Sequence, residues 1–358
     1  AGWAPVRVLA ALGQPGAPWT GRLGRDALGT LVDPFAAQVA VVDVDLDFVV
    51  GARRPRHPLD PFEPPLRLLD VPRSLGSWVS LCADPKRRLY ASDQKAGLYR
   101  ITPARRTGEL TRFERVPVAL GGAHGLLWWR DALYAVVNGD GSGLYRLTDT
   151  DGDDALDRVE LLRALDGKGE HGPHSVVVAP DGENLLVLCG NHTKLPELAA
   201  NRVPGVLAED RLVPRLDDPH PYWEGHSPPG GWVCLVDPDG ERWELLCCGF
   251  RNPYDLVVCG QRVVVYDADM EWDMGLPWYR PTRLLEAQSG VDYGWRIGSA
   301  KWPVDYPDAP PALCDLGPGS PVGMAPNGGD GGSVRFLLLD WTFGTVYQAS
   351  IRVTAGPA

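Results

Sequence analysis

No stretch of the sequence approaches the ~20 consecutive apolar residues that a helix needs to cross a bilayer, so we expect no membrane span. Apolar residues also never keep a 3.6-residue spacing across several turns, which excludes a helical solenoid. The seven cysteines form neither a C-x-x-C nor a C-x-x-C-H motif, so neither haem attachment nor a cysteine-based zinc site is expected. Because several of them sit in apolar, strand-like runs, we predict buried free thiols, with one disulfide as the alternative.

Positive charge is in the minority. Lys and Arg number 35 against 46 Asp and Glu, the formal net charge is −11, and no basic stripe is present. We therefore expect no nucleic-acid partner. The chain starts at Ala1 without Met or a signal peptide, from which we expect a processed or trimmed N-terminus.

Turn-forming residues, by contrast, are abundant. Gly occurs 42 times and Pro 34 times, which favours many short strands. An internal repeat organises them: residues 96–102, AGLYRIT, recur as residues 142–148, SGLYRLT, each after an apolar run. A period of ~40–50 residues with four short strands is typical of a β-propeller blade. The sequence therefore predicts an all-β propeller with four-stranded antiparallel blades.

Two segments outside the repeat have signatures of their own. Residues 42–49, VDVDLDFV, alternate apolar and acidic side chains, so we expect a half-exposed strand with its acids on a solvated or edge face. Residues 191–230 contain seven prolines, and a connection of this length is expected to lie over one face of the propeller.

The sharpest local pattern is acidic. Residues 149–160, DTDGDDALDRVE, have carboxylates at positions 1, 3, 5, 9 and 12 of a twelve-residue loop. They are Asp149, Asp151, Asp153, Asp157 and Glu160. Calcium takes six to eight oxygen ligands, and this spacing lets one loop supply several of them. We predict a structural Ca²⁺ clip between blades, with an acidic surface turn as the alternative.

A second pattern contains histidine. His171 and His174 lie in the Gly- and Pro-rich segment GEHGPH, just before a predicted strand, and His192 follows the next strand. An imidazole titrates near neutral pH, which is what a general base requires. The three histidines could instead bind a metal ion, or His171 could be an ordinary hydrogen-bonded loop residue.

A third pattern combines arginines and acids. Arg251 and Asn252 form a rigid turn with Pro253, and a guanidinium there can pair with a ligand carboxylate. Four acids and two arginines follow within about thirty residues. They are Asp267, Asp269, Glu271, Asp273, Arg280 and Arg283. The alternative to a ligand site is a salt-bridged loop network.

These motifs resemble those of the glucose/sorbosone dehydrogenase family of six-bladed propellers. The resemblance is carried by GFRNP at 249–253, by the PDG turn at 180–182 preceded by His171, and by SGVDYGW at 289–295. A closer likeness is to propeller domains of planctomycete-type proteins that are labelled membrane-bound dehydrogenase or haem-binding. It is carried by residues 76–79, 144–154, 266–271, 278–283 and 317–324.

The resemblance implies one six-bladed propeller domain over residues 1–358. Recognisable blades would occupy residues 76–350, and an irregular N-terminal segment with closing strands would occupy residues 1–75. Family members use pyrroloquinoline quinone (PQQ) and Ca²⁺ to oxidise sugars. The resemblance therefore implies a periplasmic or otherwise extracytoplasmic enzyme for a sugar or alcohol. Because no C-x-x-C-H motif is present, electrons would pass to a separate acceptor such as a cytochrome c.

The resemblance also implies roles for individual residues. His171 lies ten residues before Asp181 and matches the family's catalytic base. Arg251 and Asn252 match the pair that contacts the quinone. Cofactor-side Ca²⁺ ligands would come from the segment that holds Asp267, Asp269 and Glu271.

The sequence also departs from the family pattern. The quinone-binding Lys has no counterpart in DWTFG at 340–344, and the C-terminal Arg pair is missing, so Arg280, Arg283 or Lys301 would have to substitute. Three functions therefore stay open. They are a PQQ-dependent dehydrogenase, a non-catalytic propeller that binds partners or assembles, and a metal-dependent hydrolase or lactonase.

Overall fold

The computed structural model of the chain describes residues 44–49, 71–95, 97–104, 109–204, 228–268, 271–273, 276–278, 280–297, 302, 306, 309–330 and 333–352. Within these ranges almost all regular structure is β-strand. The one helical segment there is a 3₁₀ turn, η1, at Arg73–Leu75. No helix in the described part of the chain is long and apolar enough to cross a membrane.

The described strands form six sheets. Five of them are blades, which we number 1 to 5 in chain order, and the sixth is a two-stranded hairpin. Blade 1 contains β2 (Trp78–Ala83), β3 (Leu89–Asp93), β4 (Leu98–Thr102) and β5 (Arg112–Arg115). Blade 2 contains β6 (Ala123–Trp129), β7 (Ala132–Val137), β8 (Gly143–Thr148) and β9 (Arg158–Ala164). Blade 3 contains β10 (Pro173–Val178), β11 (Leu185–Cys189), β13 (Gly231–Val236) and β14 (Trp243–Phe250), and the short β12 (Ala200–Asn201) pairs in parallel with β14.

Blade 4 contains β15 (Asn252–Cys259), β16 (Arg262–Ala268), β19 (Thr282–Glu286) and β20 (Cys314–Gly317). The connection between β16 and β19 carries a hairpin of β17 (Glu271–Asp273) and β18 (Leu276–Trp278). Blade 5 contains β21 (Pro321–Asp330), β22 (Ser333–Asp340) and β23 (Thr345–Arg352). Its outermost strand is β1 (Val44–Val49), from near the other end of the sequence.

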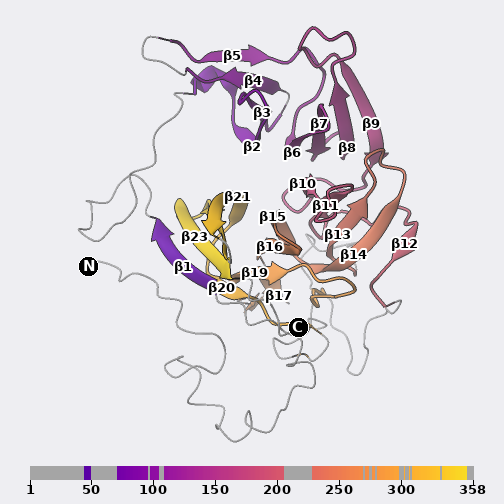
Figure 1. Cartoon of the computed structure of the whole chain (residues 1–358). Helices are drawn as coiled ribbons and strands as arrows, with labels where there is room; N and C mark the ends of the chain where they lie inside the picture. Colours follow the sequence, from indigo (N-terminus) through magenta and orange to yellow (C-terminus); the bar gives the residue numbers. More distant parts are fainter. Residues whose placement is uncertain are drawn as a thin grey trace, which may run out of the picture.

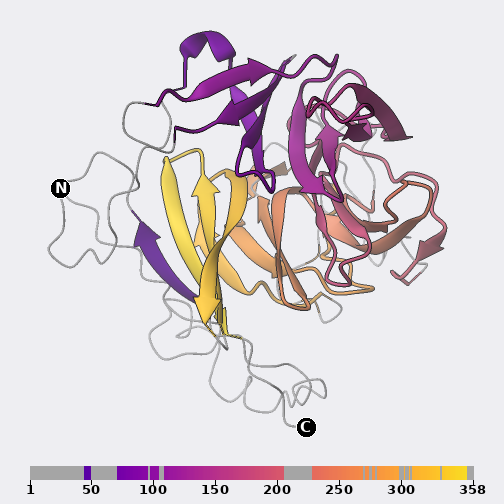
Figure 2. The same ribbon diagram turned by 45° about the horizontal axis from the view of Figure 1, so that its top comes forward.

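The sheets are arranged as a propeller. Figure 1 shows them around a common centre, and the innermost strands pack in the order β2, β6, β10, β15 and β21. Figure 2 shows β1 beside β23 at the outer edge of blade 5. The alternating pattern of residues 42–49 predicted a half-exposed strand, and residues 44–49 do form a strand. The prediction of an all-β propeller with antiparallel blades is confirmed. The described residues form five blades, so the sixth blade is not confirmed.

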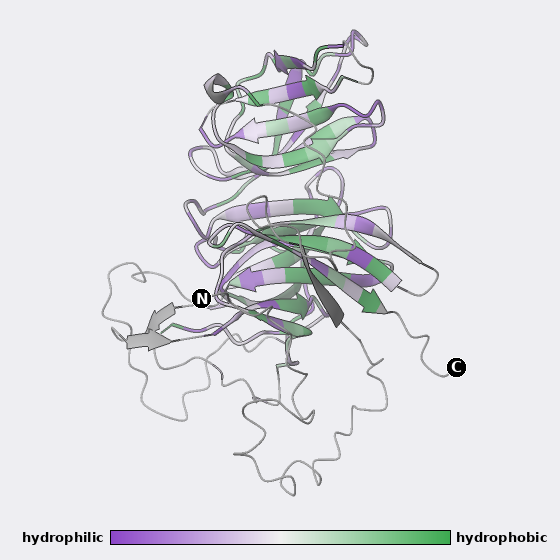
Figure 3. Cartoon of the chain, turned by 90° about the vertical axis from the view of Figure 1, so that its left-hand side faces the viewer, coloured by the Kyte–Doolittle hydropathy of each residue, from purple (hydrophilic) through white to green (hydrophobic). Residues whose placement is uncertain are grey.

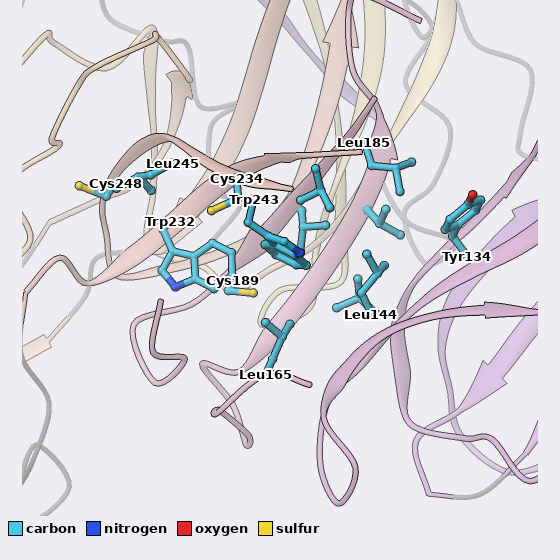
Figure 4. Close-up of a cluster of buried hydrophobic side chains, with 14 of the residues drawn as sticks. Tyr134, Leu144, Leu165, Leu185, Cys189, Trp232, Cys234, Trp243, Leu245 and Cys248 are labelled. Carbon is cyan, nitrogen blue, oxygen red and sulfur yellow. The ribbon is translucent and has the colours of Figure 1, made fainter. Parts of the chain in front are cut away.

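Hydrophobic residues fill the spaces between adjacent blades. Figure 3 shows apolar residues mostly on the strands and hydrophilic ones mostly on the turns. Between blades 2 and 3, Tyr134 and Leu144 belong to the same cluster of buried side chains as Trp232 and Trp243 (Figure 4). Close packing of large buried rings of this kind is what holds blade to blade. The seven cysteines are all free, and all but Cys82 are fully buried, as predicted.

The GLYR repeat has a structural explanation. Its Leu is fully buried in blades 1 and 2, whereas its Arg joins neighbouring strands and blades. Arg100 pairs with Glu114, and the equivalent Arg146 pairs with Glu160 at 2.9 Å. Arg146 also reaches Asp239 of blade 3 at 2.6 Å. The repeated arginine is therefore a link between blades rather than a ligand-binding residue.

The order of the strands separates two faces of the propeller. The loop that enters each blade and the turn between its second and third strands lie on one face, which we call the upper face. The turns between first and second strands and between third and fourth strands lie on the lower face. His171, Arg251 and residues 341–344 therefore belong to the upper face, whereas residues 149–157, between β8 and β9, belong to the lower face.

Candidate active site

Three polar residues meet on the upper face between blades 3 and 4. His171 lies in the loop before β10, Asn191 follows β11, and Arg251 joins β14 to β15. The main-chain N–H of Asn191 donates to the carbonyl oxygen of Arg251 at 2.9 Å. Its side-chain Oδ1 lies 2.6 Å from Nδ1 of His171. The fold thus brings together the imidazole and the guanidinium that the sequence separates by 80 positions.

The surroundings of His171 favour a neutral imidazole. Its side chain is 1 % exposed. Burial lowers its pKa well below the ordinary value, and the nearby charge of Arg251 and the ring of His192 lower it further. Because Oδ1 of Asn191 can only accept, the neutral ring carries its proton on Nδ1 and keeps a lone pair on Nε2. A buried neutral imidazole in this tautomer is suited to act as a general base.

Comparison between blades shows that Asn191 occupies a special position. In three blades, an Asp at or near the end of the second strand accepts a hydrogen bond from a main-chain N–H at the start of the blade. These pairs are Ser77–Asp93 at 2.8 Å, Asn252–Asp267 at 3.0 Å and Ser320–Asp340 at 2.6 Å. In blade 3 the position is Asn191, whose side chain binds His171 instead. Blade 2 also has an asparagine after its second strand, Asn138, but its side chain pairs with the main chain of Gly169. Asn191 differs from it in holding a histidine ring.

Three aromatic side chains from successive innermost strands lie beside this cluster. His124 of β6, His174 of β10 and Tyr254 of β15 each occupy the register shift near the start of their strand. The ring centroids of His124 and His174 are 5.7 Å apart, and those of His174 and Tyr254 are 4.7 Å apart. Burial lowers the pKa of His124 to about 4, so this ring too is neutral at neutral pH.

His174 has a structural environment. It is fully buried, its Nδ1 lies 2.9 Å from the carbonyl oxygen of Pro253, and its Nε2 lies 3.0 Å from that of Glu170. Both nitrogens therefore face hydrogen-bond acceptors rather than a shared ion. His192 lies against His171, with ring centroids 4.5 Å apart. No group of three donor atoms from His171, His174 and His192 converges in the described part of the chain, so no observation favours a three-histidine metal site or the hydrolase that depends on it.

The other predicted quinone ligands lie at the start of the third strand of blade 4. Arg283 is 3.4 Å from the fully buried carboxylate of Asp267, and Arg280 donates to the carbonyl oxygen of Trp302. Burial raises the pKa of Asp315, and the charges of Arg283 and Arg280 oppose that rise. These contacts are those of the salt-bridged network that the sequence offered as the alternative. Of the proposed calcium ligands here, Asp269 lies outside the described residues, and Glu271 lies on β17.

Two polar atoms beside Arg251 fit a ligand. Nδ2 of Asn191 and Oδ1 of Asn252 are buried and have no hydrogen-bond partner among the described residues. Buried polar atoms are normally satisfied, so an orphaned donor and an orphaned acceptor indicate a bound polar group. The guanidinium of Arg251 and Nδ2 of Asn191 are donors that suit a carbonyl or carboxylate oxygen, whereas Oδ1 of Asn252 is an acceptor and needs a donor on the bound group. Of the substitute cations predicted from the sequence, Arg283 is paired with Asp267, Arg280 donates to the carbonyl oxygen of Trp302, and Lys301 lies outside the described residues.

The motif at 289–295 holds the strand end that carries this site. The main-chain N–H groups of Tyr293 and Trp295 donate to the carbonyl oxygens of Cys248 and Gly249 at 2.8 Å and 2.9 Å. Gly249 has a φ of 85°, and a Cβ there would lie 2.1 Å from Oδ1 of Asp292, so only glycine fits. The segment thus clamps the end of β14 and fixes the turn that carries Arg251.

The acidic loop lies on the opposite face. Carboxylate oxygens of Asp149, Asp151 and Asp153 approach within 4.8 Å of one another, which is the one convergent group of metal-ligand side chains among the described residues. Asp157 instead accepts hydrogen bonds from Thr150, and Glu160 lies on β9 paired with Arg146. Three of the five predicted ligands therefore come together. Ca²⁺ binding by this set remains a prediction.

The acidic loop also contacts the neighbouring blade without any ion. Asp154 lies 2.6 Å from Arg88 and 2.7 Å from Lys86, both in blade 1. Arg88 is further paired with Asp84 at 2.7 Å. These ion pairs make the loop a clip between blades 1 and 2, far from His171 on the upper face.

No sequence motif indicates a role for Asn191, His124 or Tyr254. Asn191 lies in the motif GNHT, in which His192 is the residue with an obvious chemical role. An alignment of the ends of the second strands shows Asn191 at the position that Asp93 and Asp340 occupy in their blades. His124 and Tyr254 sit in ordinary apolar strand patterns, and only the packing of blades brings their rings together.

No family model matches the sequence, and no curated protein matches it. Among solved structures, the PQQ domain of a pyranose dehydrogenase from Coprinopsis cinerea aligns at 12% identity over 74% of this chain and 71% of that one, with a TM-score of 0.51. An oxidoreductase of Thermus thermophilus described as a glucose dehydrogenase aligns at 18% identity over 83% and 80%, with a TM-score of 0.49. A Trichoderma reesei enzyme of carbohydrate-active family AA12 aligns at 10% identity over 87% and 96%, with a TM-score of 0.48. At 12% identity and a TM-score of 0.51, the likeness to the first of these structures establishes the fold alone, an all-β propeller.

Proposed function

We propose that this protein is an extracytoplasmic, single-domain propeller oxidoreductase that oxidises a hydroxyl group of a sugar or alcohol, with His171 as the general base. The observation that carries the proposal is the buried, neutral His171, held through Nδ1 by Asn191 beside Arg251. Electrons would pass to a separate acceptor such as a cytochrome c. The likeness to quinoprotein propellers supports the choice of redox chemistry through the fold alone.

In this proposal the protein's own residues bind and move one proton. A substrate hydroxyl donates to Nε2 of His171, and the proton passes to that nitrogen as the carbon is oxidised. Asn191 keeps the ring in the orientation that presents Nε2. Arg251 disfavours a lasting imidazolium beside it, so the proton leaves to solvent after the reaction.

Arg251, Asn252 and Asn191 would hold the edge of PQQ, which when bound supplies the two-electron acceptor for the substrate carbon. Asp267 is paired with Arg283 and is therefore a poor Ca²⁺ ligand. We assign Ca²⁺ instead to Asp149, Asp151 and Asp153 on the lower face, in a structural role.

Reconstitution tests this function. The purified protein is titrated with PQQ in the presence of Ca²⁺, and binding is followed by the quinone absorbance. Dye reduction is then measured with aldoses and primary alcohols. The proposal expects saturable quinone binding and substrate-dependent dye reduction. Failure of both would contradict it.

The second candidate is a non-catalytic propeller that kept the fold and lost the quinone site. It is favoured by one observation: Arg283 is paired with Asp267 and Arg280 with Trp302, so neither is placed to replace the missing quinone-binding cations. This candidate predicts no quinone binding at any Ca²⁺ concentration. This candidate would be rejected if the parent chain binds quinone and the Arg251→Met variant does not.

A further inference from the structure

Two large aromatic side chains are exposed on the upper face. Trp341 is 77 % exposed and Phe343 is 60 % exposed. They are the exposed aromatic residues of the described chain, and both lie in the four-residue turn between β22 and β23 of blade 5. That turn joins the second and third strands, which puts it on the same face as His171 and Arg251. An exposed tryptophan and phenylalanine need a reason, because burial of each would favour folding by a few kcal/mol.

The backbone of this turn is fixed. The buried carboxylate of Asp340 accepts hydrogen bonds from the main-chain N–H groups of Phe343 at 2.8 Å and Ser320 at 2.6 Å. The main-chain N–H of Trp341 donates to the carbonyl oxygen of Ser320 at 3.0 Å. A Cβ on Gly319 would lie 2.1 Å from Oδ2 of Asp340, so the neighbouring strand is held against the turn. The turn presents its rings on a rigid support, which lowers the entropic cost of binding.

Two hydroxyl groups accompany the rings at this turn. The hydroxyl of Thr342 donates to the hydroxyl of Ser320 at 2.8 Å. A hydroxyl that has accepted one hydrogen bond still has a proton to donate, and Ser320 has no acceptor for it among the described residues. The turn therefore offers apolar ring faces together with a hydroxyl donor.

Size and charge narrow the class of ligand. Two rings on one short turn are far smaller than the ~800 Å² per partner of a standard protein interface. A chain of net charge −11 is repelled by anionic membranes and other polyanions. A small neutral ligand with an apolar face and a rim of hydroxyls satisfies both limits. Pyranose rings have this character.

We propose that Trp341 and Phe343 form a carbohydrate-stacking subsite on the upper face, with the hydroxyls of Ser320 and Thr342 as its polar rim. The choice of a carbohydrate rests in part on the proposed oxidation of a sugar. The subsite itself needs neither cofactor nor turnover, and it would select pyranosides or oligosaccharides over simple alcohols.

A binding experiment on the full chain tests this subsite directly. The protein is labelled with 5-fluorotryptophan, and the Trp341 resonance is assigned by its loss in Trp341→Phe. Methyl β-D-glucopyranoside and cellotetraose are titrated without quinone. We expect a saturable shift of the Trp341 resonance. The affinity for cellotetraose, measured by isothermal titration calorimetry because Trp341→Ala removes the resonance, should fall about 3- to 10-fold in Trp341→Ala and in Phe343→Ala. The matched control Leu339→Ala removes a half-exposed apolar side chain just before the turn and should leave the affinity unchanged.

The outcomes are distinct from those of the redox test. If both sugars leave the Trp341 resonance in place, or if Trp341→Ala binds cellotetraose as tightly as the parent chain, the subsite is overturned even if the protein oxidises alcohols with PQQ. If sugars shift the Trp341 resonance and Trp341→Ala lowers the affinity for cellotetraose while quinone binding fails, the subsite is supported and the dehydrogenase proposal is contradicted.

Discussion

The two polar clusters of this propeller differ in their exposure, in the face on which they lie and in how many of their polar atoms have partners. The acidic loop at 149–157 is exposed, lies on the lower face, and gives most of its carboxylates to hydrogen bonds and ion pairs within the fold. On the upper face, His171 and Asn191 are buried beside the partly exposed Arg251, and polar atoms of Asn191 and Asn252 have no partner among the described residues. A conspicuous motif can thus be structural, whereas unsatisfied buried groups point to a ligand.

The largest expected effect comes from the upper face. His171→Gln removes the group that accepts the substrate proton, so turnover with PQQ should fall at least about 100-fold. The melting temperature should change little in comparison. Glu170→Gln, which alters an exposed carboxylate in the same loop, is the matched control and should retain full turnover. Equal losses of turnover in both variants would contradict the assignment of His171 as the general base.

Asn191 should act through His171. Asn191→Ala removes the acceptor that fixes the ring, and we expect about a 10-fold loss of turnover. Asn191→Asp replaces it with a carboxylate, which favours the imidazolium and raises the pKa of His171. Since activity requires neutral His171, the acid limb of the pH–rate profile should move to higher pH in Asn191→Asp. An unmoved profile would show that Asn191 is only structural.

The lower face should affect stability rather than turnover. Arg88 and Lys86 hold the pKa of Asp154 well below its ordinary value, so its ion pairs stabilise the fold above the pKa of an unfolded Asp and are lost as the pH falls through the lower, folded-state pKa. Asp154→Ala should lower the free energy of unfolding by about 1 kcal/mol at neutral pH, because the pair is partly exposed. The difference from the parent chain should shrink in acid. Urea unfolding at several pH values measures this.

Calcium should have the smallest effect. If Asp149, Asp151 and Asp153 bind Ca²⁺, adding it raises the melting temperature by mass action, by a few degrees at saturating concentrations for a site of modest affinity. Asp151→Asn should abolish the rise without changing quinone binding on the opposite face. A melting temperature indifferent to Ca²⁺ would leave the loop as a clip of ion pairs alone.

Much of the architecture could be read from the sequence because the GLYR repeat encodes one blade and recurs at a blade's spacing. The meeting of His171 and Arg251 needed the family resemblance, since no local pattern relates residues of different blades. Other contacts depend on strand register, which the sequence does not display. The sequence predicts Glu160 as the last ligand of a loop, but Glu160 lies on β9 opposite Arg146. It predicts Asp267 as a calcium ligand, but Asp267 lies opposite Arg283 on the neighbouring strand.

The protonation state of His171 is the point from which the proposed chemistry follows. Ring ¹⁵N chemical shifts, assigned by their loss in His171→Gln, report it without substrate, cofactor or turnover. The account predicts a neutral ring protonated on Nδ1 at neutral pH, still neutral well below the ordinary pKa of histidine. An imidazolium at neutral pH, or a neutral ring protonated on Nε2, would contradict it.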